Sequence, residues 1–227
     1  MQNQFKDYKA FLFDLNGTMV DDMSYHIKAW HRILNNLGSG LTWQQVKQEC
    51  YGKNQELLER IFPGRFSQEE KEQLSFEKEK QYQIEFRPEL KLIKGLDEFL
   101  RKAHDSGIKI AIGTAAILFN VDFVLDGLNI RENIDAIVSA DDVRISKPHA
   151  ETYLKCAEAL GVEPADCLVF EDAPKGVESA FNAGMDCVVI TTLHQLEEFS
   201  TYKNVIGFIS NFDDLFLKKI VKWKQTV

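Results

Sequence analysis

The sequence predicts an α/β fold, in which a doubly wound parallel sheet forms the core and a small helical domain is inserted near its start. From residue 91 onward, short apolar runs alternate with helical segments. Continuous apolar runs are typical of parallel strands that are buried on both faces. A further apolar strand, beginning at Phe11, precedes a helical block at residues 22–90. We therefore expect a core domain of residues 1–21 and 91–227 and an inserted helical cap domain of residues 22–90.

The inserted block has helical signals along its length. Apolar residues recur at helical spacing between residues 24 and 37, and Gly38 is a typical C-terminal cap. In a capping box, a hydroxyl side chain and the side chain three residues later each accept a hydrogen bond from the other's backbone N–H. Two such boxes mark further helix starts: Thr42 with Gln45, and Ser67 with Glu70.

The remaining elements alternate in type, as a parallel sheet with crossover helices requires. In order, we expect a helix ended by Gly107, a strand at 108–114, a helix at 117–126, a strand at 135–140, a helix at 148–161, a strand at 167–172, a helix at 174–184 and a strand at 186–192.

Composition narrows the classes of function. The chain has 227 residues, 44% of them hydrophobic, which is enough for a full core, and a net charge of -8. Such a charge argues against nucleic acid or an anionic membrane as a partner, because no long-range positive field would attract either.

The four cysteines form no Cys-x-x-Cys pair, which favours reduced thiols. With no apolar signal segment or spanning run, we expect a cytoplasmic protein, by default a monomer.

Polar residues stand where the predicted strands end. Ligands of open parallel sheets bind beyond the carboxyl ends of the strands. Lys147 precedes Pro148, a proline that is expected to open the next helix. Hard carboxylate oxygens suit Mg²⁺, whereas a lysine and a hydroxyl suit phosphoryl oxygens. The residues at the strand ends fit both kinds of ligand: Asp14, Thr114 and the pair Glu171–Asp172.

This ordered set resembles the haloacid dehalogenase superfamily, and in particular its β-phosphoglucomutase-like subgroup. The resemblance covers nearly the whole chain and rests on "DLNGT" from Asp14, on Thr114, on "SKPHAETY" around Lys147 and on "FED" ending at Asp172. It implies a Rossmann-like core with a helical cap inserted after the first strand.

The resemblance also implies roles for these residues. Asp14 would be the nucleophile that becomes an aspartyl phosphate, and Thr114 and Lys147 would hold the transferring phosphoryl group. Mg²⁺ would be bound by Asp14, Asp172 and the backbone carbonyl of Asn16, with Glu171 in a supporting position. A carboxylate that attacks an anionic phosphate needs such cations to offset the repulsion.

Asn16 departs from the family pattern. Phosphatases and mutases of this family have a second aspartate here, which gives a proton to the leaving group and then takes one from the attacking hydroxyl. An amide cannot relay a proton, and such catalysis contributes about 10² to 10⁴ in rate. Asn16–Gly17 is also a strong hairpin signal, so a tight turn is the competing interpretation.

Candidate substrate-binding residues follow from the same resemblance. Each cap residue has a structural alternative as well, namely packing for the histidine and a solvated helix face for the lysine. The arginine that the family places three residues after Gly52 is a glutamine here, and the residues after Thr114 are apolar rather than polar. The candidates are Thr18, His26, Gly52, Lys53, Lys78 and Ala115.

Three functions therefore stay open. The first is a Mg²⁺-dependent phosphatase that hydrolyses a small phosphorylated metabolite such as a sugar phosphate. The second is a sugar-phosphate mutase. The third is a binder of a phosphorylated ligand that turns over poorly because Asn16, native or substituted, has replaced the acid/base residue.

Overall fold

The computed structural model describes residues 6–221 and 223. The chain divides into two compact units. One is an α/β unit formed by the chain up to Asp21 and from Lys91 onward, and the other is a helical unit, Asp22–Leu90. Within the described residues, no helix has both the length and the apolar character needed to cross a membrane.

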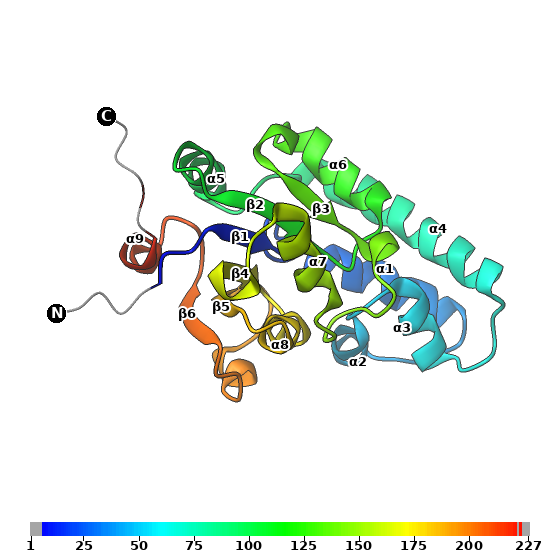
Figure 1. Cartoon of the computed structure of the whole chain (residues 1–227). Coiled ribbons are helices and arrows are strands. Elements are labelled where there is room, and N and C mark those ends of the chain that lie inside the picture. The colour runs from blue at the N-terminus through cyan, green and yellow to red at the C-terminus, as the bar shows by residue number, and fades with distance from the viewer. Residues whose placement is uncertain (1–5, 222, 224–227) are drawn as a thin grey trace. The chain divides into compact units, whose positions relative to one another are not determined.

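The α/β unit is built on a parallel sheet of six strands in the order β3-β2-β1-β4-β5-β6 (Figure 1). The chain builds outward from β1 to β3 and then returns to the other side of β1, so the strand order reverses between β1 and β4. Ligand sites of such sheets form at this reversal. The strands are β1 (Ala10–Phe13), β2 (Lys109–Gly113), β3 (Ala136–Val138), β4 (Cys167–Glu171), β5 (Asp186–Ile190) and β6 (Val205–Ile209).

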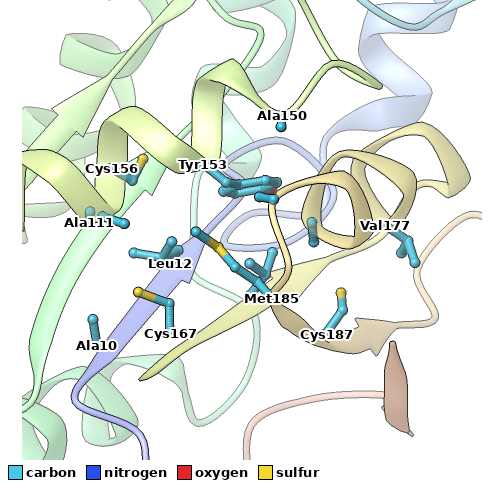
Figure 2. Close-up of a cluster of buried hydrophobic side chains, with 14 of the residues drawn as sticks. Ala10, Leu12, Ala111, Ala150, Tyr153, Cys156, Cys167, Val177, Met185 and Cys187 are labelled. Atoms are coloured by element: carbon cyan, nitrogen blue, oxygen red, sulfur yellow. The ribbon is translucent and has the colours of Figure 1, made fainter. Parts of the chain in front are cut away.

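Helices cover both faces of this sheet, which confirms the predicted fold class. Alternate residues of a strand point to opposite faces. On one face of β1, Leu12 packs in an apolar cluster with residues of α7 and α8 (Figure 2). On the other face, the Phe11 ring stacks on Phe99 of α5 at 5.3 Å between centroids. The helices of this unit are α5 (Leu96–Asp105), α6 (Leu118–Leu128), α7 (Glu151–Leu160), α8 (Pro174–Asn182) and α9 (Leu215–Ile220).

The helices of the helical unit have the caps that the sequence predicts. Both capping boxes are present, with Thr42 accepting from the backbone N–H of Gln45 and Ser67 from that of Glu70. Gly38, at a φ of 89°, follows the end of the first helix, and this left-handed conformation favours glycine. The helices are α1 (Met23–Asn36), α2 (Trp43–Glu49), α3 (Asn54–Ile61) and α4 (Gln68–Phe86).

One local prediction is wrong, and one turn signal takes a different form. Pro148 does not open a helix, because α7 begins only at Glu151 and the Lys147–Pro148 peptide bond is cis. Asn16–Gly17 is not the centre of a two-residue hairpin. A type I′ turn needs positive φ at both central residues, whereas in the described chain Asn129 alone among non-glycine residues has a positive φ.

The edge strand β6 lies where the sequence analysis expected no element. Its apolar run is interrupted by Gly207, and glycine weakens a strand signal. The structure gives the reason for the glycine, since a Cβ at this position would lie 2.2 Å from a ring carbon of Phe216. Close packing against Phe216 therefore excludes a side chain at position 207.

Phe99 should be a main source of stability on its face of the sheet. The side chain is buried and its ring contacts those of Phe11, Phe170 and others. We expect Phe99→Ala to lower the free energy of unfolding by about 3–5 kcal/mol, measured by chemical denaturation, because it leaves a cavity. Phe181→Ala, at a half-exposed ring, should change it by less than about 0.5 kcal/mol. Equal losses would contradict this account.

Candidate active site

Four charged side chains meet beyond the carboxyl ends of β1 and β4, at the point where the strand order reverses. Asp14 follows β1 directly, and its backbone N–H donates to the carbonyl of Phe170 on β4 at 3.0 Å. Glu171 ends β4 and Asp172 follows it. Because β1 and β4 are paired neighbours, their ends place these carboxylates together. Lys147 reaches them from the loop before α7.

Lys147 is the centre of the site. Its ammonium donates to Asp14 Oδ1 and to Glu171 Oε1, each at 2.6 Å. It also donates to the hydroxyl of Tyr153 at 3.0 Å. The lysine is only 6% exposed, so these contacts replace most of its water. The sequence-predicted residues Asp14, Lys147 and Glu171 thus form one buried ionic cluster.

Glu171 is held by donors on both of its oxygens. Oε1 accepts from Lys147 and from the Tyr153 hydroxyl, the latter at 2.7 Å. Oε2 accepts from the backbone N–H groups of Asp172 and Ala173, at 3.1 and 3.3 Å. These amides precede α8, and a helix N-terminus favours an anion. The carboxylate is therefore fixed in place by both side chains and backbone.

The charges of the cluster stabilise one another. Burial by itself lowers the pKa of the Lys147 ammonium, but the carboxylates of Asp14 and Glu171 outweigh it, so this pKa lies above its ordinary value. Burial, together with Glu171 and Asp14, raises the pKa of the Tyr153 hydroxyl well above its ordinary value. At neutral pH the lysine is a cation and the tyrosine is neutral. A positive charge is therefore maintained beside Asp14.

The same carboxylates fit a divalent cation. Asp14, Glu171 and Asp172 each offer one oxygen, and these three oxygens lie within 4.8 Å of one another. All three residues are buried. Mg²⁺ prefers hard oxygen ligands and is commonly held by one or two carboxylates. The donor set thus suits Mg²⁺.

The loop after Asp14 is compact. The N–H of Gly17 donates to the carbonyl of Val20 at 2.8 Å, and that of Met19 donates to Leu15 at 2.8 Å. Gly17 has a φ of 79°, which favours glycine. Asn16 is half-buried, whereas Thr18 is fully buried. These hydrogen bonds therefore hold Asn16 in a fixed turn directly after Asp14.

Thr114 and Ala115 follow β2, the neighbour of β1 on its other side. Thr114 is buried, and its Oγ1 accepts from the backbone N–H of Ala116 at 3.1 Å. A hydroxyl that accepts in this way keeps its own proton for another acceptor. Thr114 is thus at the same sheet edge as Asp14, as predicted from the strand ends.

Two candidates in the helical unit, His26 and Lys78, contact each other. Lys78 donates to His26 Nδ1 at 2.5 Å and to the two oxygens of Glu79 at 3.0 and 3.1 Å. The His26 ring stacks on Tyr82. Both His26 and Lys78 are buried. Lys78 is therefore not on a solvated helix face, the alternative that its charge-rich sequence suggested.

Gly52 and Lys53 precede α3 and have local roles. Gly52 has a φ of 71°, which favours glycine. Lys53 is the N-cap of α3, and its backbone N–H donates to the Glu56 side chain at 2.9 Å. The backbone conformation of Gly52 and the N-cap hydrogen bond of Lys53 therefore both belong to the turn that starts α3.

Tyr153 and Gly176 were missed by the sequence analysis. A Cβ at Gly176 would lie 1.8 Å from Glu171 Oε1, so this glycine of α8 leaves the space that the carboxylate occupies. Tyr153 is part of the apolar face of α7, and nothing in a helical pattern separates a packing tyrosine from one that bonds to a lysine. Only its place six residues after Lys147 could have suggested a link.

Comparisons with known proteins agree with this fold. Residues 11–190 match the model of the haloacid dehalogenase-like hydrolase family. The chain is 32% identical to the β-phosphoglucomutase of Bacillus subtilis over 79% of this chain and 82% of that protein. It is 29% identical to the fructose-1-phosphate phosphatase of Escherichia coli over 83% of this chain and 100% of that protein.

A solved structure supports the same relationship. The β-phosphoglucomutase of Clostridium difficile superimposes with a TM-score of 0.80 at 26% identity, covering 94% of this chain and 97% of that one. The parallel sheet with helices on both faces is a Rossmann-like core. The chain belongs to the haloacid dehalogenase-like hydrolase family, and it is an enzyme of the phosphatase and phosphomutase group that the resemblance predicted.

Gly176→Ala tests how the site is held. The added methyl group would overlap the Glu171 carboxylate and force it away from Lys147. We expect the free energy of unfolding to fall by about 1–3 kcal/mol, as in other overpacked sites, measured by urea denaturation. Lys175→Ala, at the neighbouring position of α8, removes a surface ion pair with Glu178 and should cost less than about 1 kcal/mol. An unchanged stability of Gly176→Ala would contradict the described packing.

Proposed function

We propose that this protein is a Mg²⁺-dependent phosphatase of a small phosphorylated metabolite such as a sugar phosphate, and that it acts through an aspartyl phosphate at Asp14. The observation that supports this most directly is the buried Lys147 ammonium, bonded at 2.6 Å to both Asp14 and Glu171. A permanent cation beside a carboxylate nucleophile offsets its repulsion from an anionic phosphate.

The proposed reaction has two displacements at phosphorus. In the first, an oxygen of Asp14 attacks, the ester bond breaks and the sugar oxygen leaves with the bonding electrons. In the second, water attacks the phosphoryl group, the bond to Asp14 breaks and inorganic phosphate is released. Thr114 is proposed to donate to a phosphoryl oxygen, and the Lys147 ammonium, which stays bonded to Asp14, Glu171 and Tyr153, offsets the charge of the phosphoryl group. The backbone amides before α8 keep Glu171 in contact with Lys147.

Asp14 and Asp172, with the backbone carbonyl of Asn16, are the proposed Mg²⁺ ligands. When bound, Mg²⁺ would offset charge on the phosphoryl group and help to orient it. Glu171 is proposed to act beside them by holding Lys147. The fit of the buried carboxylate set supports this assignment.

Asn16 is proposed to position the leaving group without relaying its proton. The turn holds residue 16 two positions after Asp14, where an acid would serve the leaving oxygen. An amide there can donate a hydrogen bond but cannot transfer a proton at neutral pH. Turnover in this chain is therefore expected to be limited by protonation of the leaving group.

A mutase is the second candidate, and the 32% identity to a β-phosphoglucomutase supports it. The contacts that Lys78 makes in the helical unit favour the phosphatase instead. In β-phosphoglucomutases, which the sequence resembles, the position of Lys78 lies at the distal phosphate of the substrate; here Lys78 is paired with Glu79 and bonded to His26. Released inorganic phosphate would identify the phosphatase, and an isomerised sugar phosphate would identify the mutase.

The helical unit is proposed to act as a cap that selects the substrate. It is inserted directly after the loop that contains Asp14 and Asn16, and the chain crosses twice between the units. This tether to the nucleophile's own loop supports a role in choosing the substrate.

Removing the Asp172 carboxylate should weaken metal binding. We expect Asp172→Ala to weaken Mg²⁺ binding by at least about tenfold in titration calorimetry, because one of two proposed carboxylate ligands is lost. Asp186→Asn is a matched control, since this carboxylate stands at the start of β5 and bonds to Tyr8 instead. An Asp172→Ala protein with unchanged Mg²⁺ affinity would refute the assignment.

Restoring an acid at position 16 should raise turnover. We expect Asn16→Asp to increase kcat for sugar phosphates by roughly 10² or more with little change in ligand affinity, because the leaving group gains a proton donor. Asn36→Asp makes the same chemical change at an exposed position of α1 and should have no effect. Phosphate release can be followed by a colorimetric assay.

The same experiment separates the remaining alternatives. Binding of a sugar phosphate without turnover in the chain as it stands, with turnover gained in Asn16→Asp, would identify a catalytically impaired binder. Efficient turnover that Asn16→Asp leaves unchanged would mean that another group relays the proton. Because Asn–Gly steps are prone to deamidation, peptide mass spectrometry should verify that residue 16 is still asparagine.

A further inference from the structure

Tyr153 of α7 is a buried tyrosine whose hydroxyl bonds to two members of the ionic cluster. It accepts from Lys147 Nζ at 3.0 Å and donates to Glu171 Oε1 at 2.7 Å. We propose that Tyr153 is a positioning residue, whose hydroxyl sets the direction in which Lys147 presents a proton toward Asp14. This inference rests on the proposed phosphoryl transfer at Asp14.

The geometry of an ammonium group gives the first argument. A lysine ammonium has three N–H bonds and rotates freely unless they are engaged. Here it has three acceptors: Asp14 Oδ1, Glu171 Oε1 and the Tyr153 hydroxyl. Two of these acceptors, Glu171 and Tyr153, are also bonded to each other. Bonds to this linked pair fix the rotation, so the third N–H points at Asp14.

The packing of the ring gives the second argument. Tyr153 is fully buried and lies in the apolar cluster between the sheet and helices α7 and α8 (Figure 2). A Cβ at Gly113 of β2 would lie 3.1 Å from a ring carbon of Tyr153, so the glycine leaves room for the close approach of α7. The hydroxyl is therefore the tip of a rigid side chain, whereas Lys147 is long and flexible. Rigid neighbours are what hold a reactive group in its productive geometry.

The hydroxyl and the ring make separable contributions. Lys147 Nζ lies 4.7 Å from the centroid of the Tyr153 ring, close enough for a cation–π attraction. Tyr153→Phe keeps this attraction and the packing but removes the oxygen. It would leave one N–H of a buried ammonium unpaired, which is unfavourable, so the ammonium should turn away from its present direction. The variant thus tests the hydroxyl alone.

The experiment compares Tyr153→Phe with Tyr8→Phe. Tyr8 also donates its hydroxyl to a carboxylate of the α/β unit, Asp186 at 3.0 Å, but at the opposite ends of the strands. Both variants are made in the chain as it stands and in the Asn16→Asp background, and kcat and KM are measured with fructose 1-phosphate. We expect Tyr153→Phe to lower kcat by about tenfold to a hundredfold, the effect of one hydrogen bond to a charged group, with KM changed by less than about threefold. Tyr8→Phe should change neither.

A crystal structure of Tyr153→Phe provides a readout that does not depend on turnover. A Lys147 ammonium displaced from Asp14 would support the proposal. An ammonium that keeps both contacts of the parent structure, or a kcat equal to that of the parent, would overturn it. So would an equal loss of kcat in Tyr8→Phe, because the effect would then be general. A different result would contradict the proposed function itself: Asp14→Ala would release phosphate as fast as the parent protein.

Discussion

The ion pairs of Lys147 with Asp14 and Glu171 are the interaction on which the arrangement of this active site depends. A buried ammonium without partners would be strongly unfavourable, and so would two buried carboxylates without a cation. Here one cation joins the end of β1 to the end of β4, two strands whose ends are more than 150 residues apart in the chain. The surroundings of Asp14, the proposed nucleophile, are therefore set by charge balance across neighbouring strands.

Two further features keep this cluster in place from different elements. The backbone N–H groups before α8 hold one oxygen of Glu171, and the absence of a side chain at Gly176 leaves room for the other. On the side of α7, the tyrosine hydroxyl bonds to both the lysine and the glutamate. Both helices pack on the same face of the sheet. The chemistry at the sheet edge is thus supported by the apolar core beneath these helices.

The helical unit contains a second buried lysine whose charge is balanced by a neighbouring carboxylate. Its buried lysine, Lys78, is neutralised by the adjacent Glu79, and Asn54 also donates to this glutamate at 2.5 Å. A cation that is already paired attracts a second phosphate less strongly. Together with an amide in place of an acid at Asn16, this pairing is the basis on which we propose a phosphatase rather than a mutase. Family membership therefore does not by itself define the reaction.

The sequence by itself determined the α/β class, the inserted helical block and the strand-end residues of the site, because these depend on periodicity and on local residue type. Capping boxes at Thr42 and Ser67 are local for the same reason. Tertiary structure alone decided the rest. The Asn16–Gly17 signal indicated a hairpin, but contacts of the loop after β1 imposed another turn. Strand β6 was hidden by Gly207, whose need is visible only where Phe216 packs on it. Tyr153 looks like any core tyrosine until the fold brings its hydroxyl to Lys147 and Glu171, since a hydrogen bond between distant elements leaves no periodic trace in the sequence.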